Sequence, residues 1–221
     1  MHDLPCRDIQ VDEIWGYIGK KERHVTIEEE AQGLGDVWTF ISLDRETKLV
    51  PTFLVGKRDH PHAYCFLHDL TGRMKNRIQL STDAMGAYLT AVEKTFGENV
   101  DYGQIVKTYG VDDTRDGQRK YSPANIVAVM RNPLVGNPDY GRISTSHVER
   151  QNLTMRMHVR RLTRLTNAFS KKLDNFKAAV ALHFAYYNFV KVHSAIRTTP
   201  AIAAGVASRL WTVSDLVELA C

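Results

Sequence analysis

The strongest restriction on the fold is a period-two alternation of side chains in the first half of the chain. From Val37 to Leu43 every second residue belongs to the set Val, Thr, Ile and Leu, and the residues between them are Trp, Phe and Ser. Such alternation is typical of a β-strand, whose successive side chains point to opposite faces of a sheet. Residues 36–56 continue through a polar turn at Asp44 to Thr47 into a second apolar run. They therefore predict two strands joined by a turn.

The rest of the chain alternates strand and helix patterns before it becomes mainly helical. Met85, Leu89, Val92 and Phe96 have the spacing of one helical face, and Gly97 closes that helix. Strands gathered early with helices interleaved indicate a single α/β domain around a mixed sheet. Further strands are expected at residues 9–18, 78–83 and 100–108, helices at about 61–70, from 146, over 174–191 and near the C-terminus, and an irregular insertion at about 110–145.

The composition describes an ordinary globular protein with a mild surplus of positive charge. Of 221 residues, 43% are apolar and 24% charged, and the net charge is +4. This surplus is compatible with a polyanionic partner and does not by itself establish one. Three separated cysteines without a CxxC pair argue against a zinc ribbon or a disulfide framework. The longest uncharged stretch, from Ala178 to Val190, is too short to cross a membrane and no signal peptide opens the chain, so we expect a cytoplasmic, nucleoid-associated protein.

Three carboxylates stand at positions where α/β proteins build sites. Asp12 lies inside the first apolar strand, Asp83 ends a strand where a helix begins, and Glu149 lies in the first turn of a basic helix. Ligand sites in α/β sheets gather at strand ends, so the three acids can converge on one crevice. A carboxylate inside a strand loses hydration, and a cationic partner or a bound metal recovers that cost. Two hard divalent ions bound there would activate a water and stabilise a leaving oxygen, and Mg²⁺ is well suited to this role.

Each acid also has a second interpretation. Asp12 alternatively sits on an edge strand and faces water. Asp83 alternatively caps the helix that follows it, a common position for Asp. Glu149 follows Ser146 by three residues, which is the spacing of a capping box, so its carboxylate alternatively accepts the Ser146 amide hydrogen.

The region around the third acid is strongly basic. Between residues 142 and 172, Glu149 is the only acid. On a single helix through this region Glu149, Arg156 and Arg160 project from nearly the same line, with Arg164 close by. Such a file of arginines suits a phosphodiester that runs along the helix, and the alternative is a solvated basic face. The basic residues are Arg142, Arg150, Arg156, Arg160, Arg161, Arg164, Lys171 and Lys172.

Several stretches carry a resemblance to a known family. The segments VDEIWGYIGKK, GDVWTFISLDRETKLVPTFLVG, RIQLSTDAMGAYLTAVEKTFG and ISTSHVERQNLTMRMHVRRLTRLTNAFSKKLDN resemble the catalytic region of bacterial insertion-sequence transposases of the insertion-sequence-one type. The similarity is continuous from about Leu4 to the C-terminus, and STSHVERQNLTMRM is its highly specific part.

The resemblance implies a ribonuclease-H-like mixed sheet flanked by helices, with a DDE triad that binds Mg²⁺ or Mn²⁺ at a two-metal site. By that similarity the catalytic and metal-binding acids are Asp12, Asp83 and Glu149. Arg156, seven positions after the third acid, is implied to contact phosphate near the transposon end. The other residues expected to bind DNA are Asn152, Arg150, Arg160 and Arg164.

The implied activity is that of a DDE-type DNA transposase. Metal-dependent cleavage frees a 3′-hydroxyl at an insertion-sequence end, and that hydroxyl then attacks target DNA. The expected partners are transposon-end and target DNA, with a homodimer or larger assembly on the DNA and no membrane. Two rival readings are a nuclease of the same fold that cuts without joining, and a truncated non-catalytic regulator of transposition.

The expected organisation is one catalytic domain followed by a short tail. Residues 1–200 form the ribonuclease-H-like domain, with the insertion at about 110–145, and residues 201–221 form a helical C-terminal tail. Transposases of this type normally carry an N-terminal zinc-binding and helix-turn-helix region, and residues 1–221 contain no counterpart of it.

Overall fold

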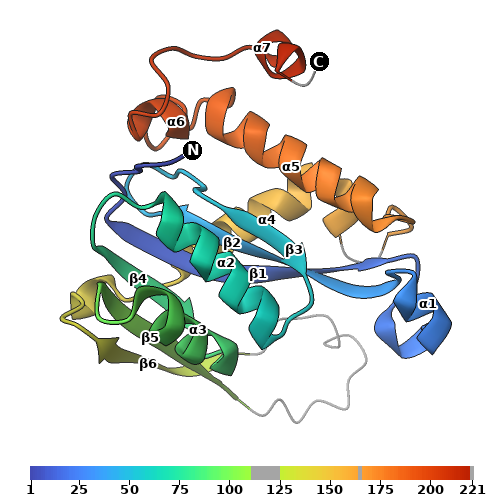
Figure 1. Ribbon diagram of the computed structural model, residues 1–221, viewed down its shortest axis with the longest axis horizontal. Helices are drawn as coiled ribbons and strands as arrows, with labels where there is room; N and C mark the ends of the chain where they lie inside the picture. The colour runs from blue at the N-terminus through green and yellow to red at the C-terminus, as the bar shows by residue number, and fades with distance from the viewer. Residues whose placement is uncertain (111–124, 164–165, 220–221) are drawn as a thin grey trace.

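The computed structural model describes residues 1–110, 125–163 and 166–219, in which six strands form one mixed sheet (Figure 1). The order across the sheet is β3-β2-β1-β4-β5-β6. The strands are β1 (Asp8–Ile18), β2 (Gly35–Asp44), β3 (Phe53–Gly56), β4 (Ile78–Asp83), β5 (Val100–Tyr109) and β6 (Ile126–Val135).

β1 lies inside the sheet and has neighbours of opposite direction. β2 runs antiparallel to it, and β4 runs parallel to it from the pair Asp8 and Gln79 to the pair Gln10 and Ser81. β3 is antiparallel to β2, β5 is parallel to β4, and β6 is antiparallel to β5. Three antiparallel strands followed by two parallel ones, in the order 3-2-1-4-5, are the topology of the ribonuclease-H-like fold. The predicted fold class is therefore confirmed.

Helices cover both faces of the sheet (Figure 1). On one face α2 and α3 bury Phe66 and Tyr88 with Val11 of β1, and on the other α4 and α5 bury Met155 and Phe176. No helix in the described part of the chain is both long and apolar enough to span a bilayer. The helices are α1 (Ile27–Ala31), α2 (His60–Arg73), α3 (Gly86–Phe96), α4 (Ser146–His158), α5 (Leu173–Phe189), α6 (Pro200–Ala203) and α7 (Val213–Glu218), with short 3₁₀ turns at Glu22–His24, Tyr140–Arg142 and Arg160–Leu162.

Local signals set several of these helix ends. The Asp59 carboxylate accepts the His62 amide hydrogen at 3.0 Å and caps α2, which has Pro61 in its first turn. Gly97, at φ +53, ends α3 where the sequence predicts a stop. α6 begins at Pro200, so it spans the expected boundary between the catalytic domain and the tail.

The insertion expected at about 110–145 contains a regular strand, β6. The sequence gives no strand signal because the side chains of β6 are exposed or half-buried on both faces, so burial imposes no period-two pattern. Asn132-Pro133 also has the appearance of a turn. As an edge strand β6 accommodates Pro133, which has no amide hydrogen to donate. Residues 111–124 of the expected insertion lie outside the described residues.

The basic helix begins where expected but ends early, at His158. Val159 has an extended backbone and is buried, and the 3₁₀ turn after it directs Leu162 into the core. Leu162 packs closely on β1, since a Cβ added at Gly16 would lie 3.3 Å from Leu162 Cδ2. The expected line of arginines along one helix is therefore wrong, because Arg160 lies beyond the helix end.

Candidate metal centre

The middle of the sheet brings two of the predicted acids side by side. The parallel pairing of β1 with β4 ends at Gln10 and Ser81, and Asp12 and Asp83 follow two residues later on each strand. Two carboxylates thus stand where the strands stop pairing. Because β1 lies between β2 and β4, the interpretation of Asp12 as an edge-strand residue facing water is wrong.

Glu13 joins these two acids, and the sequence pattern did not single it out. Carboxylate oxygens of Asp12, Glu13 and Asp83 lie within 4.8 Å of one another, and this is the metal-compatible group found among the described residues. Glu13 accepts from Arg58 Nε at 2.5 Å and from the Tyr88 hydroxyl at 2.8 Å. Arg58 Nη2 also lies 3.7 Å from Asp83 Oδ2. The available signal was the pair of adjacent acids, Asp12 and Glu13, in one apolar strand.

Glu149 approaches the same centre from α4. Its carboxylate accepts from the Thr145 hydroxyl at 2.5 Å and forms an ion pair with Lys107 of β5. One turn later, Asn152 Nδ2 donates to Asp12 Oδ2 at 2.7 Å, which ties α4 directly to β1. Glu149 is not in the group within 4.8 Å; it lies beside that group and Lys107 balances its charge.

The concentration of acids changes the protonation of Asp12. Burial and then the charge of Glu13 raise the pKa of Asp12 from 3.8 to about 7, and Asp83 and Glu149 add to the rise. Burial, with the charge of Asp83, also raises the pKa of Glu13. Near neutral pH Asp12 is therefore divided between its acid and carboxylate forms. A bound cation favours the carboxylate form, so this centre gains free energy by binding one.

The capping interpretations hold only in part. The N-cap of α3 is Met85, whose amide hydrogen is accepted by Asp83 Oδ1 at 3.0 Å, so Asp83 shapes the turn before the helix without capping it. The N-cap of α4 is Thr145. The capping box expected at Ser146 does not form, since the Ser146 amide donates to Ser144 Oγ at 3.2 Å.

The residues expected to bind DNA fall in different surroundings. Arg150 is exposed on α4, and Arg160 is exposed in the 3₁₀ turn that follows. Arg156 is half-buried on α4. Asn152 is only 4% exposed and is hydrogen-bonded within the acid centre, so it lies inside the site and not on the helix surface. Arg164 lies outside the described residues.

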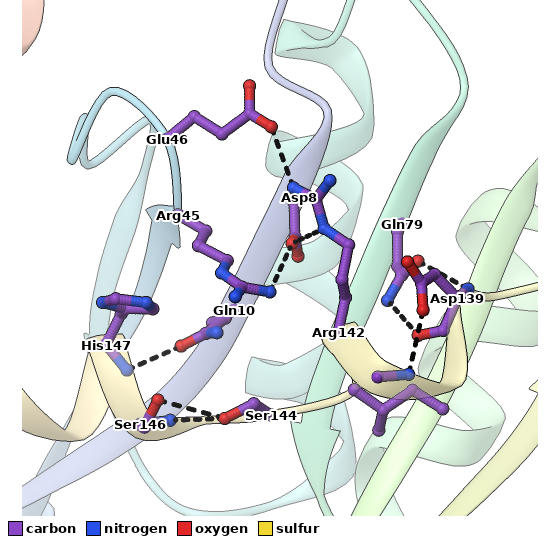
Figure 2. Close-up of polar contacts among 12 residues, drawn as sticks. Asp8, Gln10, Arg45, Glu46, Gln79, Asp139, Arg142, Ser144, Ser146 and His147 are labelled. Carbon is purple, nitrogen blue, oxygen red and sulfur yellow. Dashed lines mark hydrogen bonds and ion pairs between the residues drawn. The ribbon is translucent and has the colours of Figure 1, made fainter.

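A buried glutamine holds α4 in register with β1, as Figure 2 shows. Gln10 Oε1 accepts the amide hydrogens of His147 at 2.8 Å and of Val148 at 3.2 Å. These are first-turn amides that have no partner within the helix. Since Gln10 precedes Asp12 by two residues on the same face of β1, this contact sets the position of Glu149 relative to Asp12.

An ion-pair network anchors the segment that leads into α4 (Figure 2). Asp8 is 1% exposed and accepts from Arg142 Nε at 2.9 Å, with Arg45 Nη1 at 3.5 Å. Burial raises the pKa of Asp8, and the two arginines offset part of that rise. Arg142 also donates to Glu46 at 2.8 Å. The chain before α4 is thereby fixed to β1 and to the β2–β3 connection.

The donors around Asp12 suit a hard divalent cation. They are carboxylate and amide oxygens, which Mg²⁺ and Mn²⁺ prefer, and the group contains no Cys or His to favour zinc. Asn152 Oδ1 is buried without a hydrogen-bond partner among the described residues, although the nitrogen of the same amide binds Asp12. Asp12, Glu13 and Asp83 form the group that could hold a metal, and Glu149 lies beside it, paired with Lys107.

The chain is similar to solved structures but not to known sequences. No protein-family model and no curated protein sequence matches this chain. Among solved structures, a chain of the simian T-cell lymphotropic virus intasome in complex with PP2A regulatory subunit B56 gamma matches with a TM-score of 0.49 at 13% identity. The match covers 95% of this chain, which spans 58% of the length of that one. What this chain does is therefore inferred from its own residues.

Proposed function

We propose that this protein is a metal-dependent DNA transposase that cleaves a phosphodiester at a DNA 3′ end and transfers that end to target DNA. The observation that supports this most is that Asp12 and Asp83 lie on neighbouring parallel strands while α4, which carries Glu149, is hydrogen-bonded to Asp12 through Asn152. These three acids are also the ones that the sequence resemblance to insertion-sequence transposases implies.

The residues of the centre have separate roles in this proposal. Asp12, Asp83 and Glu149 would hold one or two ions of Mg²⁺ or Mn²⁺, which when bound supply activation of the attacking oxygen and stabilisation of the leaving one. Asn152 orients Asp12 through its amide nitrogen. Lys107, paired with Glu149, is a cation placed to balance the charge of a phosphodiester at the centre. No serine or tyrosine nucleophile is needed, because the displacement proceeds without a covalent link to the protein.

The test is cleavage and joining of short DNA duplexes. Wild-type protein is compared with Asp83→Asn and Glu149→Gln, and Glu93→Gln, an exposed acid of α3, serves as the matched control. We expect activity that requires Mg²⁺ or Mn²⁺, is lost in both site variants and is retained in the control. An inactive wild-type protein whose Mn²⁺ binding is unchanged by either site substitution would contradict the proposal.

The same assay separates the rival functions. Pre-cleaved ends that are joined to target DNA identify a transposase, whereas nicks without joined product identify a nuclease. A regulator would instead bind DNA and inhibit transposition even when Asp12→Ala has removed the first acid. A dimer or larger assembly on paired DNA ends, measured by mass photometry, and localisation with the nucleoid are further parts of the proposal.

A further inference from the structure

A basic cavity lies on the side of α4 away from the acids. It has a volume of about 450 Å³ and is enclosed by α4, the β2–β3 connection and the residues that follow α5. No Asp or Glu is among the described residues that line it. The residues that line it include Lys48, Arg150 and Lys191 and two histidines, His147 and His193.

Helix geometry separates this cavity from the acid centre. Successive residues of an α-helix are about 100° apart, so Gln151 projects about 200° away from Glu149. His147, Gln151 and Thr154 share one face of α4, and all three line the cavity. Arg150 lies between the two faces and is exposed. A strand that crosses α4 over Arg150 would therefore meet the acid centre on one side and this cavity on the other.

A buried hydrogen-bond donor of the cavity has no partner. Gln151 is 4% exposed, and its Nε2 has no hydrogen-bond partner among the described residues. An unpaired buried amide costs about 1–3 kcal/mol, so such groups are rare in folded proteins. An acceptor that enters the cavity would satisfy this donor.

One lysine of the cavity is held by a neighbouring histidine. Lys48 Nζ lies 3.3 Å from His147 Nδ1, and burial, with the charges of Lys48 and Arg45, lowers the pKa of His147, while Asp8 offsets part of this effect. Lys48 itself has a left-handed backbone, at φ 62, which costs a non-glycine residue about 1–2 kcal/mol. Because its pKa is lowered, His147 is a neutral imidazole whose Nδ1 accepts a hydrogen bond from Lys48, and Lys48 also donates to the Arg45 carbonyl oxygen. These contacts hold the Lys48 ammonium group in place as a positive charge of the lining that an entering anion would meet.

We propose that this cavity binds a phosphate group, supplied by a phosphodiester of the DNA strand that crosses α4. The cavity offers lysine charges, an arginine able to form paired hydrogen bonds and a glutamine amide donor, a set that fits phosphate oxygens. That the phosphate belongs to DNA rests on the proposed function; the anion specificity rests on the cavity alone.

The test measures binding of a short labelled duplex by fluorescence anisotropy, in EDTA and at several salt concentrations. The variants are Lys48→Asn, chosen because Asn tolerates a left-handed backbone, and Lys191→Gln. Each is expected to weaken binding about tenfold and to reduce the slope of log affinity against log salt by about one. Lys94→Gln, an exposed lysine of α3 on the opposite face of the sheet, is the control and should bind as wild type.

A parallel measurement identifies the source of the phosphate. Inorganic phosphate should raise the melting temperature of wild type and of Lys94→Gln, and should raise it less in Lys48→Asn. If Lys48→Asn loses the stabilisation by inorganic phosphate but binds the duplex as wild type does, the cavity is a phosphate site whose ligand is free phosphate and not DNA. Unchanged duplex affinity, salt slope and phosphate response in both cavity variants would overturn the inference. Because these assays contain no metal and need no cleavage, failure of the proposed activity would appear separately, as an inactive wild-type protein that still binds the duplex.

Discussion

Replacing Asp12 by asparagine measures how much the negative charge of Asp12 lowers the free energy of unfolding. The pKa of Asp12 rises from 3.8 to about 7 on folding, chiefly through burial and then the charge of Glu13. Between these values the native state binds a proton that the unfolded chain has released, so the free energy of unfolding falls as pH rises and stops falling above about pH 7. The pKa rises by about three, and each tenfold change in proton affinity corresponds to about 1.4 kcal/mol, so the free energy of unfolding falls by roughly 4 kcal/mol. The partial exposure of Asp12 reduces this loss to about 3 kcal/mol.

The asparagine side chain of Asp12→Asn would carry no charge at any pH, and its oxygen can still accept the Asn152 amide hydrogen. In EDTA at pH 8 we therefore expect this variant to be more stable than wild type by about 3 kcal/mol, a rise in melting temperature of roughly 6–12 °C. The difference should shrink as pH falls through this range and approach zero below about pH 3, where Asp12 is protonated in both states. Urea unfolding across this pH range measures it, with Glu93→Gln as the control. A variant that is no more stable at pH 8, or a difference that does not change with pH, would refute the reasoning.

Three further predictions concern the contacts around the centre. Arg142→Ala removes the nearest cation from buried Asp8 and should destabilise the protein by about 2–4 kcal/mol in urea unfolding, whereas an unchanged midpoint would show that Asp8 is not held by this pair. Gly103→Ala places a Cβ 2.5 Å from Ile143 Cδ1 and should cost about 1–3 kcal/mol by the same measurement. Lys107→Gln removes the cation that pairs with the third acid and should tighten Mn²⁺ binding in calorimetry; weaker binding would contradict the assigned pairing.

The parts of the fold that the sequence predicts are those where burial imposes a pattern. Alternate side chains of β2 pack into different cores, with Val37 and Ile41 on one face of the sheet and Phe40 on the other, and β4 packs Ile78 and Leu80 into the same core as Phe40. β6 has no such pattern, since it is an edge strand with few buried side chains. The end of α4 at His158 could not be predicted either, because no Gly or Pro marks it in the sequence. The turn there depends on the packing of Leu162 against Gly16.

In the candidate site, too, some residues could be predicted from the sequence and others could not. Asp12 and Asp83 were predicted from their places in strands, which are local properties of the sequence. Arg58 and Lys107 come from elements far from these acids in the chain, and no spacing rule links them to the carboxylates that they contact. Glu13 was missed because its approach to Asp83 depends on how β1 and β4 lie in the sheet, where its carboxylate comes within 4.8 Å of both other acids.

The central claim is that Asp12, Asp83 and Glu149 form one metal centre, and anomalous diffraction from crystals grown with Mn²⁺ at pH 8 tests it most directly. The account predicts an anomalous peak at about 2.1 Å from carboxylate oxygens of Asp12 and Asp83. It also predicts that the Glu149 carboxylate turns from Lys107 toward that peak. Ordered side chains at Asp12 and Asp83 with no peak between them, at an Mn²⁺ concentration that raises the melting temperature, would place the metal elsewhere and contradict the claim.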